Sequence, residues 1–318
     1  MSEQPQALHD EKNIPGGSSL SLNKGASLPS LKGLDMPARI PFTKMHGAGN
    51  DYIYVEEFDF PLPHLEALAV HISHRHFGVG GDGLVLIGPS STADFRMRIF
   101  NADGSEAEMC GNASRCVAKY LYEHKRTLKH ELSLETKAGI KSVSLEVEHG
   151  LVRAVRVNMG RPAFSPADIP MSVKAKDFIN QELTVAGTLW RGTALSMGNP
   201  HLVIFVDDLH SLDLPRIGPL FENHAYFPKR VNTEFIQVID PKRIVMRVWE
   251  RGSGETLACG TGACASLVAC VLNEKTGPDI TVSLPGGALC IEWEKGGNVF
   301  MTGPAVSVCS GNYHVPQW

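Results

Sequence analysis

The sequence lacks the features that mark several common classes of protein. No stretch of the 318 residues approaches the roughly 18 apolar residues of a membrane-spanning helix. Lysine and arginine form no long block and the formal net charge is −4, so there is no electrostatic footprint for nucleic acid. The N-terminus has no basic start followed by an apolar run, which argues against a secretory signal. We therefore expect neither a membrane nor a nucleic acid as a partner.

The cysteine pattern argues against a disulfide framework. Seven cysteines are an odd number, and no export signal precedes them. Such a chain is expected in a reducing compartment, here the cytoplasm. The thiols must then serve packing or chemistry. Packing as a small buried hydrophobe is the usual role, and we expect it for Cys116, Cys264, Cys270, Cys290 and Cys309.

Residues 1–38 differ in composition from the rest of the chain. They are rich in serine, glycine and proline, and their acidic residues Glu3, Asp10 and Glu11 do not suit a transit peptide. This composition predicts a disordered N-terminal tail. Met36 is an alternative start that the sequence leaves open.

The remaining chain repeats itself with a separation of 149 positions. Three landmarks recur in the same order: MRIFN at 97 as MRVWE at 246, Gly49-Asn50 as Gly198-Asn199, and Cys110-Gly111 as Cys259-Gly260. A separation of this size suits one domain. The repeat predicts two like halves, residues 39–157 and 158–304. The repeat does not include residues 305–318, and we expect that this C-terminal segment could join the first half.

Each half shows short strand-like segments followed by a helix. Alternating or apolar runs predict strands, namely residues 84–87, 95–100, 151–157, 233–238 and 244–249. Cys110 and Cys259 each open a helix, and the one after Cys259 is apolar nearly all round, as is typical of a buried helix. The predicted fold class is α+β. It has two pseudo-symmetric duplicated domains, each a mostly antiparallel sheet wrapped around a central helix, with the active site in the cleft between them.

Two thiols at equivalent helix starts indicate proton transfer. Free N–H groups and the helix dipole lower a thiol pKa from about 8.5 and form a site for a carboxylate. Across a pseudo-two-fold axis, Cys110 and Cys259 would face one cleft from opposite sides. That geometry suits removal of an α-proton by one thiolate and its return to the other face by the second thiol. The sequence offers no pyridoxal phosphate lysine site and no phosphate loop.

Five stretches together resemble the diaminopimelate epimerase family over residues 40–318. They are FTKMHGAGNDYIYV, RIFNADGSEAEMCGNASRC, SMGNPHLVIFV, RVNTEFIQV and ERGSGETLACGTGACA. The resemblance implies conversion of LL-2,6-diaminopimelate to the meso isomer without cofactor or metal. That step leads to lysine and, in many bacteria, to peptidoglycan.

The family's functional residues carry over by position. The catalytic thiols fall on Cys110 and Cys259, and His201 and Glu250 match positions that adjust the thiol pKa values. Substrate-binding positions fall on Asn50, Asn101, Gly111, Asn112, Asn199, Asn232, Glu250, Arg251, Gly260 and Thr261. Arg251 can hold a carboxylate with two parallel hydrogen bonds.

Two positions depart from the family pattern. Gly83 stands where some members have glutamine, so that side-chain contact is missing. Cys309 stands where relatives often have an aromatic residue that supports dimerisation. The resemblance therefore implies a homodimer more weakly than it implies the activity.

Three other functions remain open at this point. A proline or hydroxyproline racemase would also use paired cysteines, although such enzymes resemble this chain less around Asn101 and Glu250-Arg251. A zinc or redox protein could use Cys110 with Cys116 and Cys259 with Cys264, but spacings of six and five are not typical of zinc sites. A protein that only binds its ligand would give no reason for two thiols.

Overall fold

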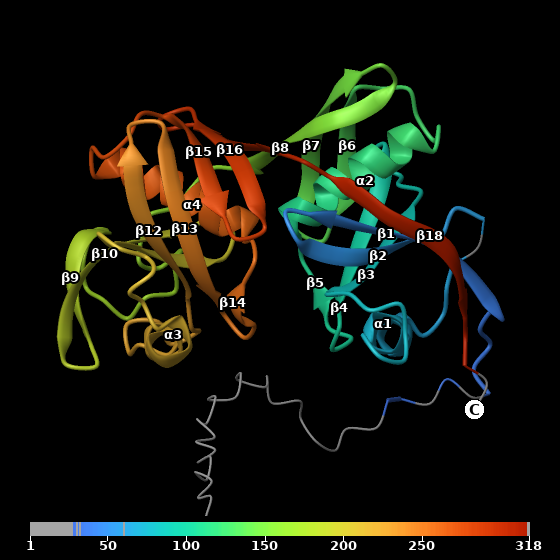
Figure 1. Ribbon diagram of the computed structural model, residues 1–318, viewed down its shortest axis with the longest axis horizontal. Coiled ribbons are helices and arrows are strands. Elements are labelled where there is room, and N and C mark those ends of the chain that lie inside the picture. The colour runs from blue at the N-terminus through green and yellow to red at the C-terminus, as the bar shows by residue number, and fades with distance from the viewer. Residues whose placement is uncertain (1–27, 30, 32, 60, 317–318) are drawn as a thin grey trace, which may run out of the picture.

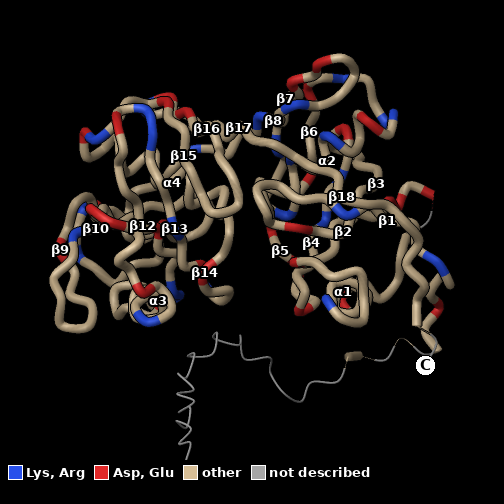
Figure 2. Tube along the Cα trace, viewed as in Figure 1, with Lys and Arg blue, Asp and Glu red and all other residues tan. Residues whose placement is uncertain are grey.

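The computed structural model describes residues 28–316 with the exception of 30, 32 and 60. Two lobes of similar build lie side by side, and each encloses a helix within strands (Figure 1). Lysine and arginine alternate with aspartate and glutamate along the trace of both lobes (Figure 2). Within the described ranges, no helix is long and apolar enough to span a membrane.

The first lobe contains two of the helices. In chain order its elements are β1 (Arg39–Gly47), β2 (Asn50–Glu56), α1 (Leu65–Ser73), β3 (Gly83–Gly88), β4 (Phe95–Asn101), β5 (Glu106–Ala107), α2 (Gly111–Glu123), β6 (Glu131–Thr136), β7 (Gly139–Glu148) and β8 (Leu151–Gly160).

The second lobe repeats this order. Its elements are β9 (Phe178–Val185), β10 (Thr188–Ser196), β11 (Pro200–Phe205), α3 (Leu214–Glu222), β12 (Asn232–Asp240), β13 (Arg243–Glu250), β14 (Gly254–Thr256), α4 (Gly260–Leu272), β15 (Asp279–Leu284), β16 (Gly287–Trp293) and β17 (Val299–Gly303). The last strand, β18 (Val306–His314), follows after two residues.

The predicted duplication and α+β class are confirmed. Three pairs of elements, β1 with β10, α1 with α3 and α2 with α4, begin and end 149 positions apart. All five predicted strands are present, as β3, β4, β8, β12 and β13. Most strand pairs are antiparallel, and the parallel exceptions also recur, β2–β3 with β11–β12 and β4–β6 with β13–β15.

The two central helices are buried as the sequence predicts. Ten of the 13 residues are buried in α2 and ten of 13 in α4. α2 packs against β1, β7 and β8, while α4 packs against strands that include β10, β11, β12 and β16. One hydrophobic cluster contains side chains of both helices, for example Val117 and Val268. The core therefore holds the starts of both helices in fixed relation to the sheets.

Two strand pairings join the halves. β8 pairs antiparallel with β17, so the last strand of one half lies against the last strand of the other. β18 then crosses to the first lobe and pairs antiparallel with β1, as Figure 1 shows. In the second lobe, β9 occupies the corresponding place beside β10. Residues 306–314 are thus part of the first lobe's sheet.

Two described residues of the predicted N-terminal tail, Pro29 and Leu31, contact the first lobe. Residues 1–27 of the expected tail lie outside the described residues. Leu31, however, is 2% exposed and packs in a cluster with Ile40, Ile53 and Leu68. The His71 ring also hydrogen-bonds the carbonyl of Pro29. Leu31 thus completes the apolar surface beside α1, while the boundary at residue 38 stays a prediction.

Candidate active site

Cys110 and Cys259 are the residues immediately before the two central helices. Both have extended backbone, with φ of −141° and −125°, and the helices begin at the glycines that follow. The predicted helix start at each cysteine is confirmed. Cys110 is partly exposed and Cys259 is buried. Because the first N–H groups of a helix have no intrahelical partner, such donors are available at both helix starts, and the Gly262 N–H reaches the Cys259 sulfur.

The starts of the two helices meet at one methionine. A β-carbon placed on Gly111 would lie 2.6 Å from the Met301 methyl carbon, and one on Gly260 would lie 3.0 Å from the Met301 sulfur. The Gly260 β-carbon position is also 3.6 Å from Asn112 Oδ1. Met301 belongs to β17, the strand that joins the lobes. The two thiol-bearing turns therefore converge where the halves meet.

Two asparagines connect Cys110 to charged residues. The Cys110 thiol donates to Asn50 Oδ1 at 3.4 Å, and Asn112 Nδ2 donates to the same oxygen at 3.3 Å. Asn50 Nδ2 donates to Asp82 at 2.8 Å, and Arg115 Nη2 donates to Asn112 Oδ1 at 3.0 Å. A carboxylate only accepts and a guanidinium only donates, so the orientation of both amides follows from their partners.

Cys259 stands at the end of a different chain of hydrogen bonds. Its sulfur accepts from the Gly262 N–H at 3.4 Å and lies 3.5 Å from Thr261 Oγ1. Asn199 Nδ2 donates to Thr261 Oγ1 at 3.3 Å, while Asn199 Oδ1 lies 2.9 Å from His201 Nε2. Beyond that, His201 Nδ1 lies 2.7 Å from Glu234 Oε1. His201 and Glu234 are both fully buried.

The electrostatic surroundings of the two thiols differ. Burial raises the pKa of Cys110, while the N–H groups of Ala113 and Asn112 and the charge of Arg115 act to lower it. Burial, then the carboxylates of Glu250 and Glu234, raises the pKa of Cys259 well above its ordinary value. The N–H groups at the helix starts act to lower both thiol pKa values as expected, but burial outweighs them, so the expected net lowering is wrong for this structure.

The remaining predicted residues lie around β12 and β13 and their counterparts. Asn232 is buried; its Oδ1 accepts from the Arg251 N–H at 2.9 Å and its Nδ2 donates to the Pro200 carbonyl at 2.9 Å. Glu250 accepts from the Thr256 hydroxyl, and burial raises its pKa. The Arg251 side chain is exposed and donates to the Lys229 carbonyl at 3.2 Å. Asn101 donates to Ser105 Oγ at 3.0 Å.

Sequence reasoning missed Asp82, Arg115 and Glu234. Asp82 stands two residues before a predicted strand and Arg115 one residue before a cysteine, but neither has a counterpart of like chemistry 149 positions on. Glu234 lies within the quoted stretch RVNTEFIQV. Comparison of the halves offered a signal, since Glu234 aligns with Val85, and a carboxylate that replaces an apolar strand residue is unusual in a core.

Gly262 makes room for Glu234. A β-carbon at this position would lie 2.6 Å from Glu234 Oε1, and the His201 contact prevents that carboxylate from moving away. We expect Gly262→Ala to cost about 1–3 kcal/mol by overpacking, less about 1 kcal/mol of helix propensity gained. Urea unfolding measures the change. The control is Gly277→Ala, because nothing lies within 4 Å of that β-carbon position. Equal stability of the two variants would contradict close packing of Glu234.

Two positions singled out in the sequence are explained by their surroundings. Gly83 pairs with Asn101 at the start of β3, and a β-carbon there would lie 2.1 Å from the Phe100 carbonyl oxygen. No side chain fits this backbone. Among the cysteines expected to be buried, Cys116, Cys264 and Cys270 are buried. The expectation is wrong for Cys290 and Cys309: Cys290 lies on the outward-facing side of β16, and Cys309 lies in residues 306–310 of β18, which are all exposed.

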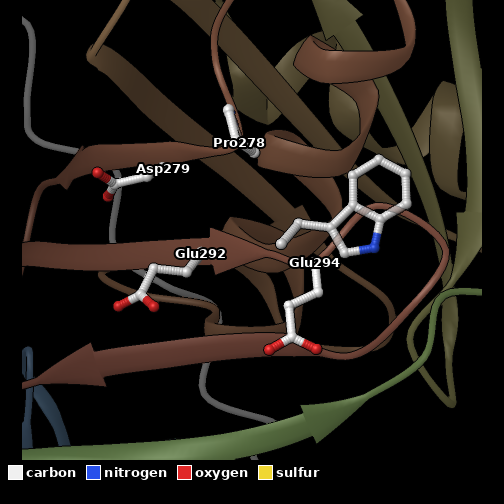
Figure 3. A pocket seen from close by; sticks show the side chains of 5 residues that line it. Pro278, Asp279, Glu292 and Glu294 are labelled. Carbon is white, nitrogen blue, oxygen red and sulfur yellow. The ribbon is translucent and has the colours of Figure 1, made fainter.

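A separate hollow of about 320 Å³ lies on the second lobe (Figure 3). Three carboxylates lie beside it, but two of them have partners, since Asp279 pairs with Lys242 and Glu292 with Arg156. It contains none of the predicted site residues. Within the described ranges, no three His, Cys, Asp or Glu side chains gather closely enough to hold a metal ion.

Solved structures share this two-lobed fold. A hydroxyproline epimerase from Agrobacterium vitis matches with a TM-score of 0.64 and 16% identity, over 86% of this chain and 92% of that one. A phenazine biosynthesis protein of the PhzF family from Bacillus anthracis matches with a TM-score of 0.61 and 16% identity, over 86% and 98%. The chain thus has the fold of these two-lobed proteins.

Sequence similarity defines the family more narrowly. The family model described as diaminopimelate epimerase matches residues 42–165 and 193–308. A diaminopimelate epimerase of Agathobacter rectalis is 54% identical over 282 residues, which are 86% of this chain and 99% of the relative. One from Methanococcus maripaludis is 50% identical over 275 residues, 86% and 99% of the two chains. The chain belongs to the diaminopimelate epimerase family.

Proposed function

We propose that the protein epimerises LL-2,6-diaminopimelate to the meso isomer without a cofactor, as a step of lysine biosynthesis. Cys110 and Cys259 would serve as the acid/base pair. The observation that carries the proposal is the convergence of two thiol-bearing helix starts on Met301, which lies against both Gly111 and Gly260. The names of the relatives support the choice of substrate.

The helix starts provide the charge stabilisation that the reaction needs. Loss of an α-proton places negative charge on the α-carboxylate, and N–H groups at Gly111, Asn112, Gly260 and Thr261 are available to it. Asn50 Oδ1 is held toward Cys110 by the bond from Asn50 to Asp82, so an α-ammonium group beside the thiol would meet an acceptor. An ammonium group there would also favour the thiolate.

The two chains of hydrogen bonds support opposite faces of the substrate. Asn50 and Asn112 adjoin Cys110, whereas Asn199 and Thr261 adjoin Cys259. His201 would act on Cys259 through Asn199 and Thr261. Glu250 acts on the pKa of both thiols, since its charge opposes formation of either thiolate. A proton removed by one thiolate would thus be replaced from the other sulfur.

Incubation of the purified protein with LL-diaminopimelate in D₂O tests the proposal. We expect meso product that carries one deuterium at the inverted α-carbon, measured by mass spectrometry and chiral chromatography. Absence of inversion would disprove the substrate assignment. Inversion without solvent deuterium would instead disprove exchange through two thiols.

We also infer a cytoplasmic homodimer, chiefly from the family resemblance. On β18, Val306 and Val308 are 41% and 55% exposed, and that strand pairs only with β1 among the described strands. Sedimentation equilibrium tests the oligomeric state; a monomer at micromolar concentration would contradict this inference and leave the proposed reaction untouched.

A further inference from the structure

Arg115 is a buried cation that has no carboxylate partner among the residues that the structure describes. It lies in the second turn of α2 and is 0% exposed. Its hydrogen bonds go to Asn112 Oδ1 at 3.0 Å, the Pro304 carbonyl at 3.2 Å and the Met301 sulfur at 3.5 Å. All three acceptors are neutral, and within the described residues Arg115 takes part in none of the ion pairs.

An unpaired buried charge is costly, so a counter-charge is expected during function. Removal of an ion from water costs several kcal/mol even after relaxation of the protein. The second half has no cation at the equivalent position, where Cys264 stands. We therefore expect the Arg115 charge to act on a group near the start of α2 whose equivalent near α4 does not need a cation.

The hydrogen bonds lead from Arg115 to the Cys110 thiol. The guanidinium fixes Asn112, Asn112 Nδ2 donates to Asn50 Oδ1, and the same oxygen accepts from Cys110. The charge of Arg115 acts directly on the Cys110 thiol as well, in the direction that favours the thiolate. Among the described residues, Arg115 is the cation that contributes most to lowering the pKa of this thiol; other titratable groups that interact with it are Tyr52, Tyr54, Cys116 and Glu250.

We propose that Arg115 is a positioning residue that provides the counter-charge for the Cys110 thiolate and makes Cys110 the thiol that ionises first. Cys259 has the opposite surroundings, since Glu250 and Glu234 both act against its thiolate. The resting proton would therefore reside on Cys259. This inference rests on the proposed function, because it assigns a role in the proposed acid/base pair, but its test requires no substrate.

The test is the pH dependence of alkylation at Cys110. Thiolates react with iodoacetamide and thiols do not, so the rate rises with pH through the pKa. In Arg115→Met, loss of the cation is expected to raise the midpoint of the pH profile for Cys110 alkylation by about one pH unit. Below that midpoint, modification of Cys110 should then be about tenfold slower. Peptide mapping by mass spectrometry separates Cys110 from the exposed Cys290 and Cys309, and Cys259 in the same sample is the internal reference.

Arg115→Lys is the matched variant, because it keeps the charge in a similar volume. We expect it to restore the Cys110 midpoint to within about 0.3 units, a twofold change in rate. If Arg115→Met does not fold, Arg115→Gln is compared with Arg115→Lys in its place. An unchanged midpoint in a folded neutral variant would overturn the proposal, as would an equal shift in the lysine variant. Rates at Cys259 should stay within about twofold throughout.

These outcomes are separable from failure of the proposed reaction. If the protein does not epimerise diaminopimelate, alkylation at Cys110 still reports on Arg115. If epimerisation is lost in Arg115→Met while the Cys110 midpoint is unchanged, Arg115 acts on the substrate or the fold, and the proposal for the thiolate is wrong.

Discussion

Replacement of either Cys110 or Cys259 by alanine is expected to lower kcat/KM for epimerisation by about 10²- to 10⁴-fold, the range that one acid/base group contributes. Inversion requires a group on each face of the α-carbon, and the structure places the two sulfurs at the starts of different helices. Steady-state assays in both reaction directions measure the loss.

Each single variant should retain a distinctive partial reaction. With one thiol left, only the α-hydrogen on that side can be removed, so each variant should exchange solvent deuterium into one stereoisomer alone. Cys290→Ala is the matched control, because it removes an exposed thiol outside the site. Either active-site variant with the activity of that control would rule out the two-thiol mechanism.

Arg251→Lys is expected to lower kcat/KM by about 10- to 150-fold, which corresponds to one charge-assisted hydrogen bond of about 1.5–3 kcal/mol. Arg251 has no charged counterpart in the first half, where Ala102 stands at the equivalent position. Its backbone N–H is fixed by Asn232 and its guanidinium is exposed, so a distal carboxylate could reach it. Lysine cannot make the paired planar contact.

Substrate comparison makes this prediction specific. Lysine lacks the distal carboxylate and should be a very poor substrate for the wild type. The control is Arg243→Lys, at the other end of β13, where the arginine pairs with Asp240 at the surface. If the wild type racemises lysine or proline as well as it epimerises diaminopimelate, the assigned substrate is wrong while the thiol chemistry stands.

The repeat made most of the fold predictable. Three short landmarks in the sequence showed a separation of 149 positions. The same separation holds for whole elements, since α2 and α4 begin and end 149 positions apart. Hydrophobic periodicity located the strands, and the cysteine-glycine pairs located the helix starts. The burial of Leu31 could not be predicted in this way, because it comes from contacts with residues distant in sequence.

The electrostatics of the candidate site could not be read in the same way. Glu234 meets His201 because β11 and β12 are parallel neighbours, and that register is a property of the sheet. Arg115 reaches Asn112 within its own helix, but only the three-dimensional structure shows that no described carboxylate pairs with it. The thiol pKa values depend on burial, which the helix-start argument did not include.

The pairing of β18 with β1 and of β17 with β8 bears on how the duplicated chain relates to a dimer of single halves. A single half would leave β8 without β17 and β1 without β18. Two separate copies could supply these strands to each other, so the molecule has the geometry of a strand-exchanged dimer tied into one polypeptide. In a dimer of identical copies every residue appears on both sides. Arg115 opposite Cys264, and His201 opposite Tyr52, are differences that a dimer of identical copies could not have.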